Sequence, residues 1–222
     1  MKLVKHRRSL PVKNHDFDTI DKSKHGELLP PNIRALIIGP SGVGKTNLML
    51  TLLEHPNGVK FENVYLYTKS LEQKKFDRLK TLLTPIKGLG YYTFQNNDDI
   101  ISDPKPNSVF IFDDVATDKQ NKIADFFSRG RHKGVDCFYL CQTYTKIPKQ
   151  LIRDNANFII LFRQDDHNLK YVYNEHASCD LSWLKFKEMC NMCWKDKFGF
   201  ITIDKYGNNY RKGLDHFFLI NE

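Results

Sequence analysis

Eight consecutive residues of this chain have the types and spacing that bind phosphate. Residues 39–46 read Gly-Pro-Ser-Gly-Val-Gly-Lys-Thr and match the pattern G-x-x-x-x-G-K-[ST] in full. In such a loop the glycines let backbone N–H groups turn toward the phosphates, and the following helix N-terminus adds partial positive charge. Lys45 would contact the β- and γ-phosphates, and the Thr46 hydroxyl would bind Mg²⁺. The residues predicted to bind the nucleoside triphosphate are Gly39, Pro40, Ser41, Gly42, Val43, Gly44, Lys45, Thr46 and Asn47.

Two adjacent carboxylates follow an apolar run later in the chain. Residues 109–112 read as a buried strand that ends in Asp113 and Asp114. In open α/β sheets, ligands bind at the carboxyl ends of the strands. Asp113 would hold Mg²⁺ as a Walker B carboxylate does, and Asp114 would orient or deprotonate the attacking water. The predicted metal ligands are therefore Thr46 and Asp113.

Gln142 and a cationic stretch are the remaining candidates for chemistry. Gln142 follows an apolar strand, where its amide would contact the γ-phosphate; the alternative is a loop residue that caps the sheet. Residues 129–133 carry four cationic side chains that would contact DNA phosphates. Alternatively, Arg131 would reach the nucleotide of a neighbouring subunit, or the stretch is a solvated turn. The rival candidate arginines are Arg153 and Arg163.

The elements that must position these residues alternate between strands and helices. This alternation predicts an α/β fold with a mostly parallel sheet, helices on both faces and a C-terminal hairpin. We expect strands over residues 34–38, 63–68, 90–94, 108–112, 136–141 and 157–162, and a hairpin that begins at 198–204 and turns at 206–209. We expect helices over residues 47–53, 71–83, 119–128, 148–154 and 183–194.

Composition favours one basic α/β domain. The chain has 222 residues, 41% of them hydrophobic, which suits a single core. We expect a basic N-terminal arm over residues 1–30 and one P-loop ATPase domain over residues 31–222. No apolar run approaches the length of a membrane span, and the N-terminus lacks the apolar region of a secretory signal. A net charge of +8 favours a polyanionic partner such as nucleic acid, although a basic protein without such a partner would also carry it.

Four residues near the C-terminus have the spacing of zinc ligands. They form the pairs His176-x-x-Cys179 and Cys190-x-x-Cys193. However, Ser182 resembles a helix N-cap, and the residues after it follow an amphipathic helical pattern. On that helix Cys190 and Cys193 would face the core together, so we favour packing over zinc.

The order of these pieces is more specific than any one of them. Residues 128–144, 147–157 and 198–204, together with the phosphate loop and the acidic strand end, resemble the viral genome-packaging ATPases of the FtsK/HerA superfamily. The poxvirus-like type, also found in Polinton/Maverick elements, adintoviruses and virophages, is the most similar. The resemblance covers roughly residues 33–205 and rests on four ordered motifs.

The resemblance implies a RecA/FtsK-like P-loop NTPase that hydrolyses ATP with Mg²⁺. It implies a homo-oligomeric ring, of five or six subunits, that moves double-stranded DNA into a preformed viral capsid at its vertex. It places Gln142 as the sensor after the fourth strand, and it matches Arg131 and Arg153 to arginine-bearing motifs without deciding which acts in trans. The implied location is the virus assembly site in the host cytoplasm or nucleus, or the virion. The family usually carries Glu where this chain has Asp114, which leaves the base open.

Two other functions fit parts of the sequence. A P-loop nucleoside or nucleotide kinase would have a similar size, but its arginines usually lie in a mobile lid, whereas Arg129 and Arg131 lie between two strands. A non-enzymatic DNA-binding protein with a relic nucleotide site would not need Lys45, Thr46 and Asp113 together. Phosphoryl transfer to a nucleoside would indicate the first, and absence of hydrolysis the second.

Overall fold

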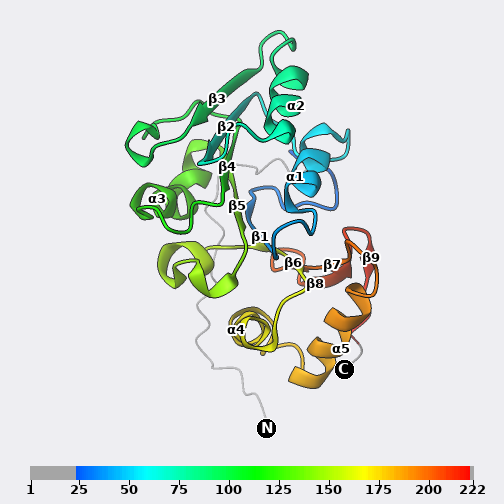
Figure 1. Ribbon diagram of the computed structural model, residues 1–222. Helices are drawn as coiled ribbons and strands as arrows, with labels where there is room; N and C mark the ends of the chain where they lie inside the picture. The colour runs from blue at the N-terminus through cyan, green and yellow to red at the C-terminus, as the bar shows by residue number, and fades with distance from the viewer. Residues whose placement is uncertain (1–23, 221–222) are drawn as a thin grey trace, which may run out of the picture.

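The computed structural model describes residues 24–220, which form one continuous nine-stranded sheet with helices on both faces (Figure 1). The strand order is β3-β2-β4-β5-β1-β6-β7-β8-β9. The first six strands in this order are parallel to one another, and β7, β8 and β9 are added in antiparallel pairing. The strands are β1 (Arg34–Ile38), β2 (Asn63–Thr68), β3 (Gly90–Phe94), β4 (Ser108–Asp113), β5 (Val135–Cys141), β6 (Phe158–Phe162), β7 (Phe200–Asp204), β8 (Asn209–Lys212) and β9 (His216–Phe217).

Two hydrophobic clusters lie on the two faces of the sheet. Alternate residues of β1 point to opposite faces, so Ile37 joins one cluster and Leu36 joins the other. The cluster of Ile37 is covered by α1 (Lys45–Glu54) and α2 (Lys74–Leu83). The cluster of Leu36 is covered by three helices, which are α3 (Asn121–Arg129), α4 (Asp166–His176) and α5 (Trp183–Cys193). The central strands are therefore buried on both sides, as their continuous apolar sequences predict.

The fold class predicted from the sequence is confirmed, with differences at three segments. Residues 149–153 do not form the expected regular helix, because Gln150 has an extended ψ of 135° and Leu151 a left-handed φ of 68°. This kink leaves Leu151 exposed while Ile152 and Arg153 are buried, so burial overrides the local helical pattern. The sequence analysis missed α4 and the short β9.

Helix α4 has a clear start signal in the structure. The Asp165 carboxylate accepts a hydrogen bond from the Asn168 backbone N–H at 2.8 Å and so caps the helix. The helix is polar along most of its length, and only Asn168, Leu169 and Val172 are buried. Because its apolar positions are few, periodicity alone did not reveal it.

The zinc-like spacing is explained by packing. Helix α5 begins at the predicted cap, where the Ser182 hydroxyl accepts from the Lys185 N–H at 3.3 Å. Cys190 and Cys193 are fully buried in the core. Across residues 24–220, no group of three His, Cys, Asp or Glu side chains is arranged to hold a metal ion. Cys190 and Cys193 pack in the core together, as the helical pattern predicted.

Most of the predicted N-terminal arm, residues 1–23, lies outside the described residues. The remainder runs against the domain, where the Lys24 ammonium lies 2.8 Å from an Asp136 carboxylate oxygen and Arg211 donates to the Leu28 carbonyl at 2.6 Å. Within the part of the chain that the structure covers, no helix combines the length and apolar character needed to cross a bilayer.

Candidate nucleotide site

The phosphate-binding loop connects β1 to α1 at the carboxyl end of the sheet, meaning the end where the parallel strands finish. Gly42 and Gly44 have φ values of 79° and 108°, a backbone conformation that other residues adopt only with strain. A Cβ added at Gly39 would lie 2.6 Å from the Phe162 Cβ, so this position has room only for glycine. The loop therefore keeps its backbone close to the sheet, with the N-terminus of α1 directly after Gly44.

Lys45 folds back over its own loop. Its ammonium donates to the carbonyls of Gly39 at 2.6 Å and Pro40 at 2.9 Å. Burial lowers the pKa of Lys45, and the nearby Asp113 and Asp114 carboxylates oppose that shift. Both partners are neutral main-chain groups, so a phosphate oxygen would be a stronger acceptor for this ammonium.

Asp113 ends β4 beside the loop and is almost fully buried, with 6% of its surface exposed. Within residues 24–220 its carboxylate has no hydrogen bond or ion pair. Burial raises its pKa to about 6, the Asp114 charge adds to the rise, and the Lys45 and Lys75 ammonium groups oppose it. An unpaired buried carboxylate next to a hydroxyl residue, Thr46, is the oxygen donor set that a hard divalent cation prefers, so the site fits Mg²⁺.

Asp114 and Gln142 meet across two neighbouring strands. The Gln142 amide nitrogen lies 3.3 Å and 3.5 Å from the two Asp114 carboxylate oxygens. Asp114 has a left-handed φ of 54°, and its N–H donates to the Leu140 carbonyl of β5 at 3.2 Å. This turn aims the Asp114 side chain along the carboxyl end of the sheet, toward the residue that follows β5.

One cleft at the carboxyl end collects most of the predicted site residues. Its lining comes from the loop, α1, α2, β4 and β5, and comprises Ser41, Gly42, Gly44, Lys45, Thr46, Gln73, Lys75, Asp113, Asp114, Leu140, Cys141 and Gln142. Of the other predicted loop residues, Pro40 and Asn47 face solvent, Val43 packs against the core, and Gly39 supports the loop from below. The sequence analysis missed Gln73 and Lys75, which α2 brings to the cleft.

The structure does not bring the candidate arginines into this cleft. Arg131 lies in the turn before β5, at the opposite, amino end of the sheet. There it is near Arg34, whose pKa is lowered mainly by the burial of Arg34 itself and further by the positive charge of Arg131. The seven residues of β5 separate the two ends by about 20 Å. Arg131 therefore cannot serve the nucleotide site of its own chain.

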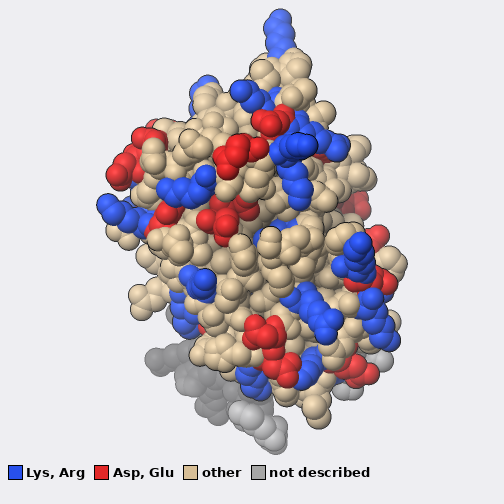
Figure 2. Space-filling model, in the orientation of Figure 1, with Lys and Arg blue, Asp and Glu red and all other residues tan. Residues whose placement is uncertain are grey.

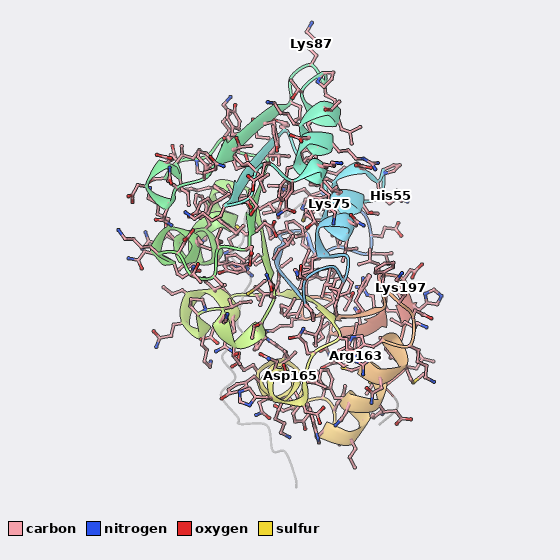
Figure 3. The ribbon with its side chains drawn as sticks, in the orientation of Figure 1. His55, Lys75, Lys87, Arg163, Asp165 and Lys197 are labelled. Atoms are coloured by element: carbon pink, nitrogen blue, oxygen red, sulfur yellow. The ribbon has the colours of Figure 1, made fainter. Side chains whose placement is uncertain are left out.

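Arg153 is enclosed within its own subunit. Its guanidinium lies 3.2 Å from a Glu175 carboxylate oxygen and 4.8 Å from the centre of the Tyr144 ring. The Tyr144 hydroxyl donates to Glu175 at 2.6 Å and contacts the His176 ring nitrogen at 2.7 Å. Arg163, which follows β6, is exposed and is not among the residues that line the cleft; in Figure 3 it lies well apart from Lys75, which is.

Comparisons with known proteins agree with this fold. The family described as Poxvirus A32 protein matches residues 21–192. No curated protein sequence matches the chain. The genome packaging NTPase B204 from Sulfolobus turreted icosahedral virus 2, in complex with sulfate, superposes with a TM-score of 0.59 at 13% identity over 87% of this chain and 100% of that one. Its complex with AMPPCP gives 0.57 at 13% identity over 83% and 98%.

B204 from Sulfolobus turreted icosahedral virus, described as a DNA-packaging ATPase, gives a TM-score of 0.56 at 14% identity over 80% of this chain and 95% of that chain. At these identities the likeness concerns the fold. The P-loop NTPase fold and the resemblance to viral packaging ATPases, both inferred from the sequence, are thereby confirmed.

Proposed function

The chain belongs to the poxvirus A32 protein family, and on that premise we propose that it is an ATP-driven motor that packages double-stranded DNA into a viral capsid. The observation that carries the proposal is the convergence of Lys45, Asp113, Asp114 and Gln142 on one cleft at the carboxyl end of the sheet. In addition, solved structures of the same fold include a packaging NTPase bound to ATP-gammaS.

Each residue of the cleft has a distinct task in hydrolysis. The loop amides and Lys45 bind the β- and γ-phosphates and hold the terminal phosphate in line with a water. Thr46 and Asp113 would hold Mg²⁺, which supplies positive charge to the phosphate oxygens. Asp114 would accept a hydrogen bond from that water and orient it, and the Gln142 amide, 3.3 Å from Asp114, would contact the same water.

Gln142 also connects the cleft to the interior. It lies two residues before Tyr144, whose hydroxyl contacts Glu175 and His176 of α4. Burial lowers the pKa of His176 to about 3, so the ring is neutral and the contact is a hydrogen bond between uncharged groups at neutral pH. A shift of Gln142 on loss of the γ-phosphate would therefore be transmitted to α4 and to Arg153.

A ring of identical subunits is the assembly that gives Arg131 a role in catalysis. Arg131 lies far from its own nucleotide but is exposed at the amino end of the sheet, where a neighbouring subunit's cleft can face it. There its guanidinium would stabilise the charge of the transition state in trans. Arg153, buried against Glu175, is more suited to holding the loop at residues 149–153 in place.

DNA would be held through its phosphates. Figure 2 shows Lys and Arg side chains spread over the visible face among Asp and Glu rather than gathered in one block. A net charge of +8 per chain, repeated around a ring, adds up to a strongly positive assembly. Binding would be independent of sequence and steeply dependent on salt. We place this activity at the capsid vertex, at a virus assembly site in the host cytoplasm or nucleus.

An ATPase assay with and without duplex DNA, combined with native mass measurement of the assembly, tests the proposal. We expect Mg²⁺-dependent ATP hydrolysis that duplex DNA stimulates, and a mass that corresponds to a ring. Phosphoryl transfer to a nucleoside without DNA stimulation would identify a kinase instead. Absence of hydrolysis at saturating Mg·ATP and DNA would indicate a non-enzymatic DNA-binding protein with a relic nucleotide site.

A further inference from the structure

Lys75 belongs to the nucleotide cleft although it lies outside every motif in the sequence. It sits in the first turn of α2, and its side chain lines the cleft together with Lys45, Asp113 and Asp114. In Figure 3, Lys75 lies between α2 and α1, and Ser41, Gly42 and Gly44 of the phosphate loop line the same cleft. Helix α2 reaches this position because β2, the strand before it, pairs with β4, the strand that ends in Asp113.

The negative charge in the nucleotide-bound cleft would exceed what Lys45 alone can compensate. The side chains at its lining include two carboxylates, Asp113 and Asp114, against one loop lysine, Lys45. A triphosphate adds further negative charge, and charge spreads onto the γ-phosphate oxygens in the transition state. Mg²⁺ compensates part of it. Without Lys75, the side of the cleft formed by α2 would present no positive side chain to the γ-phosphate.

The electrostatic environment shows that Lys75 and Lys45 act on the same groups. Burial and Asp114 raise the pKa of Asp113, and the ammonium groups of Lys45 and Lys75 both oppose that rise. Burial is also the main cause of the lowered pKa of Lys45, and Lys75 contributes to it as a like charge. Both lysines line the same cleft as Asp113, and both ammonium groups favour its charged form.

Lys75 differs from the other cations of its helix. Arg78 of α2 lies 3.4 Å from Glu54 in an ion pair, and Lys74 does not line the cleft. Lys75 has no hydrogen bond or ion pair with any side chain among residues 24–220. An unpaired ammonium on a helical residue that lines the triphosphate site is available to contact a phosphate oxygen.

We propose that Lys75 is a catalytic residue that binds the γ-phosphate from within the same subunit. It neutralises the charge that develops on the equatorial oxygens from α2, whereas Lys45 acts from the start of α1. This role rests on the proposed ATPase function and adds to it a cis-acting cation. Arg131 would then supplement the charge from a neighbouring subunit instead of supplying all of it.

The test compares Lys75→Ala with Lys74→Ala, two adjacent exposed lysines whose removal changes the net charge equally. Loss of one transition-state donor lowers kcat by about 10²–10³-fold. We expect a loss of this size for Lys75→Ala with little change in KM for ATP, near wild-type activity for Lys74→Ala, and partial recovery in Lys75→Arg. ADP with aluminium fluoride, a mimic of the transition state, should be trapped by wild-type protein and not by Lys75→Ala, while binding of ADP alone stays unchanged.

A mixing experiment distinguishes a cis from a trans role. Lys75→Ala subunits are mixed with Lys45→Ala subunits, which lack the loop lysine. If Lys75 acts in cis, every subunit of the mixture has a defective site and activity does not recover. Recovery would overturn the cis assignment, and equal rates for Lys75→Ala and Lys74→Ala would overturn the proposal while leaving the ATPase function intact. If wild-type protein hydrolyses no ATP, the proposed function fails and this inference fails with it.

Discussion

Two buried aspartates at opposite ends of the same sheet have contrasting environments. At the amino end, Asp136 accepts from the Ile33 N–H at 2.7 Å, and its other oxygen lies 2.8 Å from the Lys24 ammonium and 3.1 Å from the His25 ring. At the carboxyl end, Asp113 has no such partner among the described residues, although it is also buried. Since burying an unpaired carboxylate costs free energy, the contrast separates a residue that holds the fold from one kept for a ligand.

The largest effect that tests this contrast is loss of activity without loss of stability. Lys45→Ala removes an ammonium that contacts only loop carbonyls, so we expect hydrolysis to fall by at least ~10³-fold because phosphate charge stabilisation is lost. The melting temperature should stay within a few degrees of wild type. Steady-state ATPase assays and calorimetry measure both. Turnover at the wild-type rate would show that the phosphate loop is wrongly assigned.

A substitution at the amino end of the sheet should lower stability without lowering activity. Asp136→Ala leaves the Ile33 N–H and the Lys24 ammonium without their acceptor and removes the carboxylate beside His25, which should cost about 3 kcal/mol of unfolding free energy. Denaturant unfolding measures this loss. The kcat of the folded fraction should not change, because β5 separates Asp136 from the cleft. A drop in kcat with unchanged stability would contradict the division of roles between the two ends.

The ionised carboxylate of Asp113 should lower the folding stability of the protein without ligand. Its pKa rises from 3.8 to about 6 on folding, so the folded state binds its proton more tightly than the unfolded state does. The group therefore contributes stability at low pH, and this contribution is lost as the pH rises from about 4 to 6, by at most about 3 kcal/mol. Asp113→Asn should be more stable than wild type at pH 8, have a flatter stability profile over that window, and lack hydrolysis. Parallel profiles for the two proteins would contradict the pKa shift.

The smallest expected effect concerns contact between subunits. Arg131→Ala and Asp114→Asn are each expected to lower hydrolysis with little effect on stability, since both side chains are exposed. When the two variants are mixed, some interfaces combine an intact arginine with an intact cleft, and part of the activity should return. Absence of any recovery would mean that Arg131 does not act across a boundary, which would place more of the charge stabilisation on Lys75.

The sequence predicted those parts of the site that lie within single motifs. The strand, loop and helix around residues 34–54 and the carboxylates that end β4 have local signals, because glycine spacing and an apolar run before an acidic pair depend on near neighbours. The fold class followed from the same alternation. Gln142 lies beside Asp114 because both follow parallel strands that end on the same side of the sheet; the sequence predicted its place at a strand end but not this contact.

Lys75 and Asp136 could not be found in this way. The importance of Lys75 depends on β2 lying next to β4, and strand order is a property of the folded sheet that no local pattern encodes. Asp136 begins a strand beside an apolar run, and its partners come from residues 24–33, about a hundred positions earlier. The kink at Leu151 precedes Arg153, whose partners Glu175 and Tyr144 are likewise set by the fold and not by neighbours in the sequence.

The two outer strands of the sheet have a consequence for assembly. β9 consists of only two residues, and on the other side Tyr92 of β3 is stacked on Tyr65 at 4.7 Å while its hydroxyl accepts from the Lys105 ammonium at 2.9 Å. A strand of two residues offers a neighbour too few backbone groups for continuous pairing. At the β9 edge, neighbouring subunits of the proposed ring would then join through side chains and loops, and such contacts can break and re-form in each cycle while the sheet stays intact.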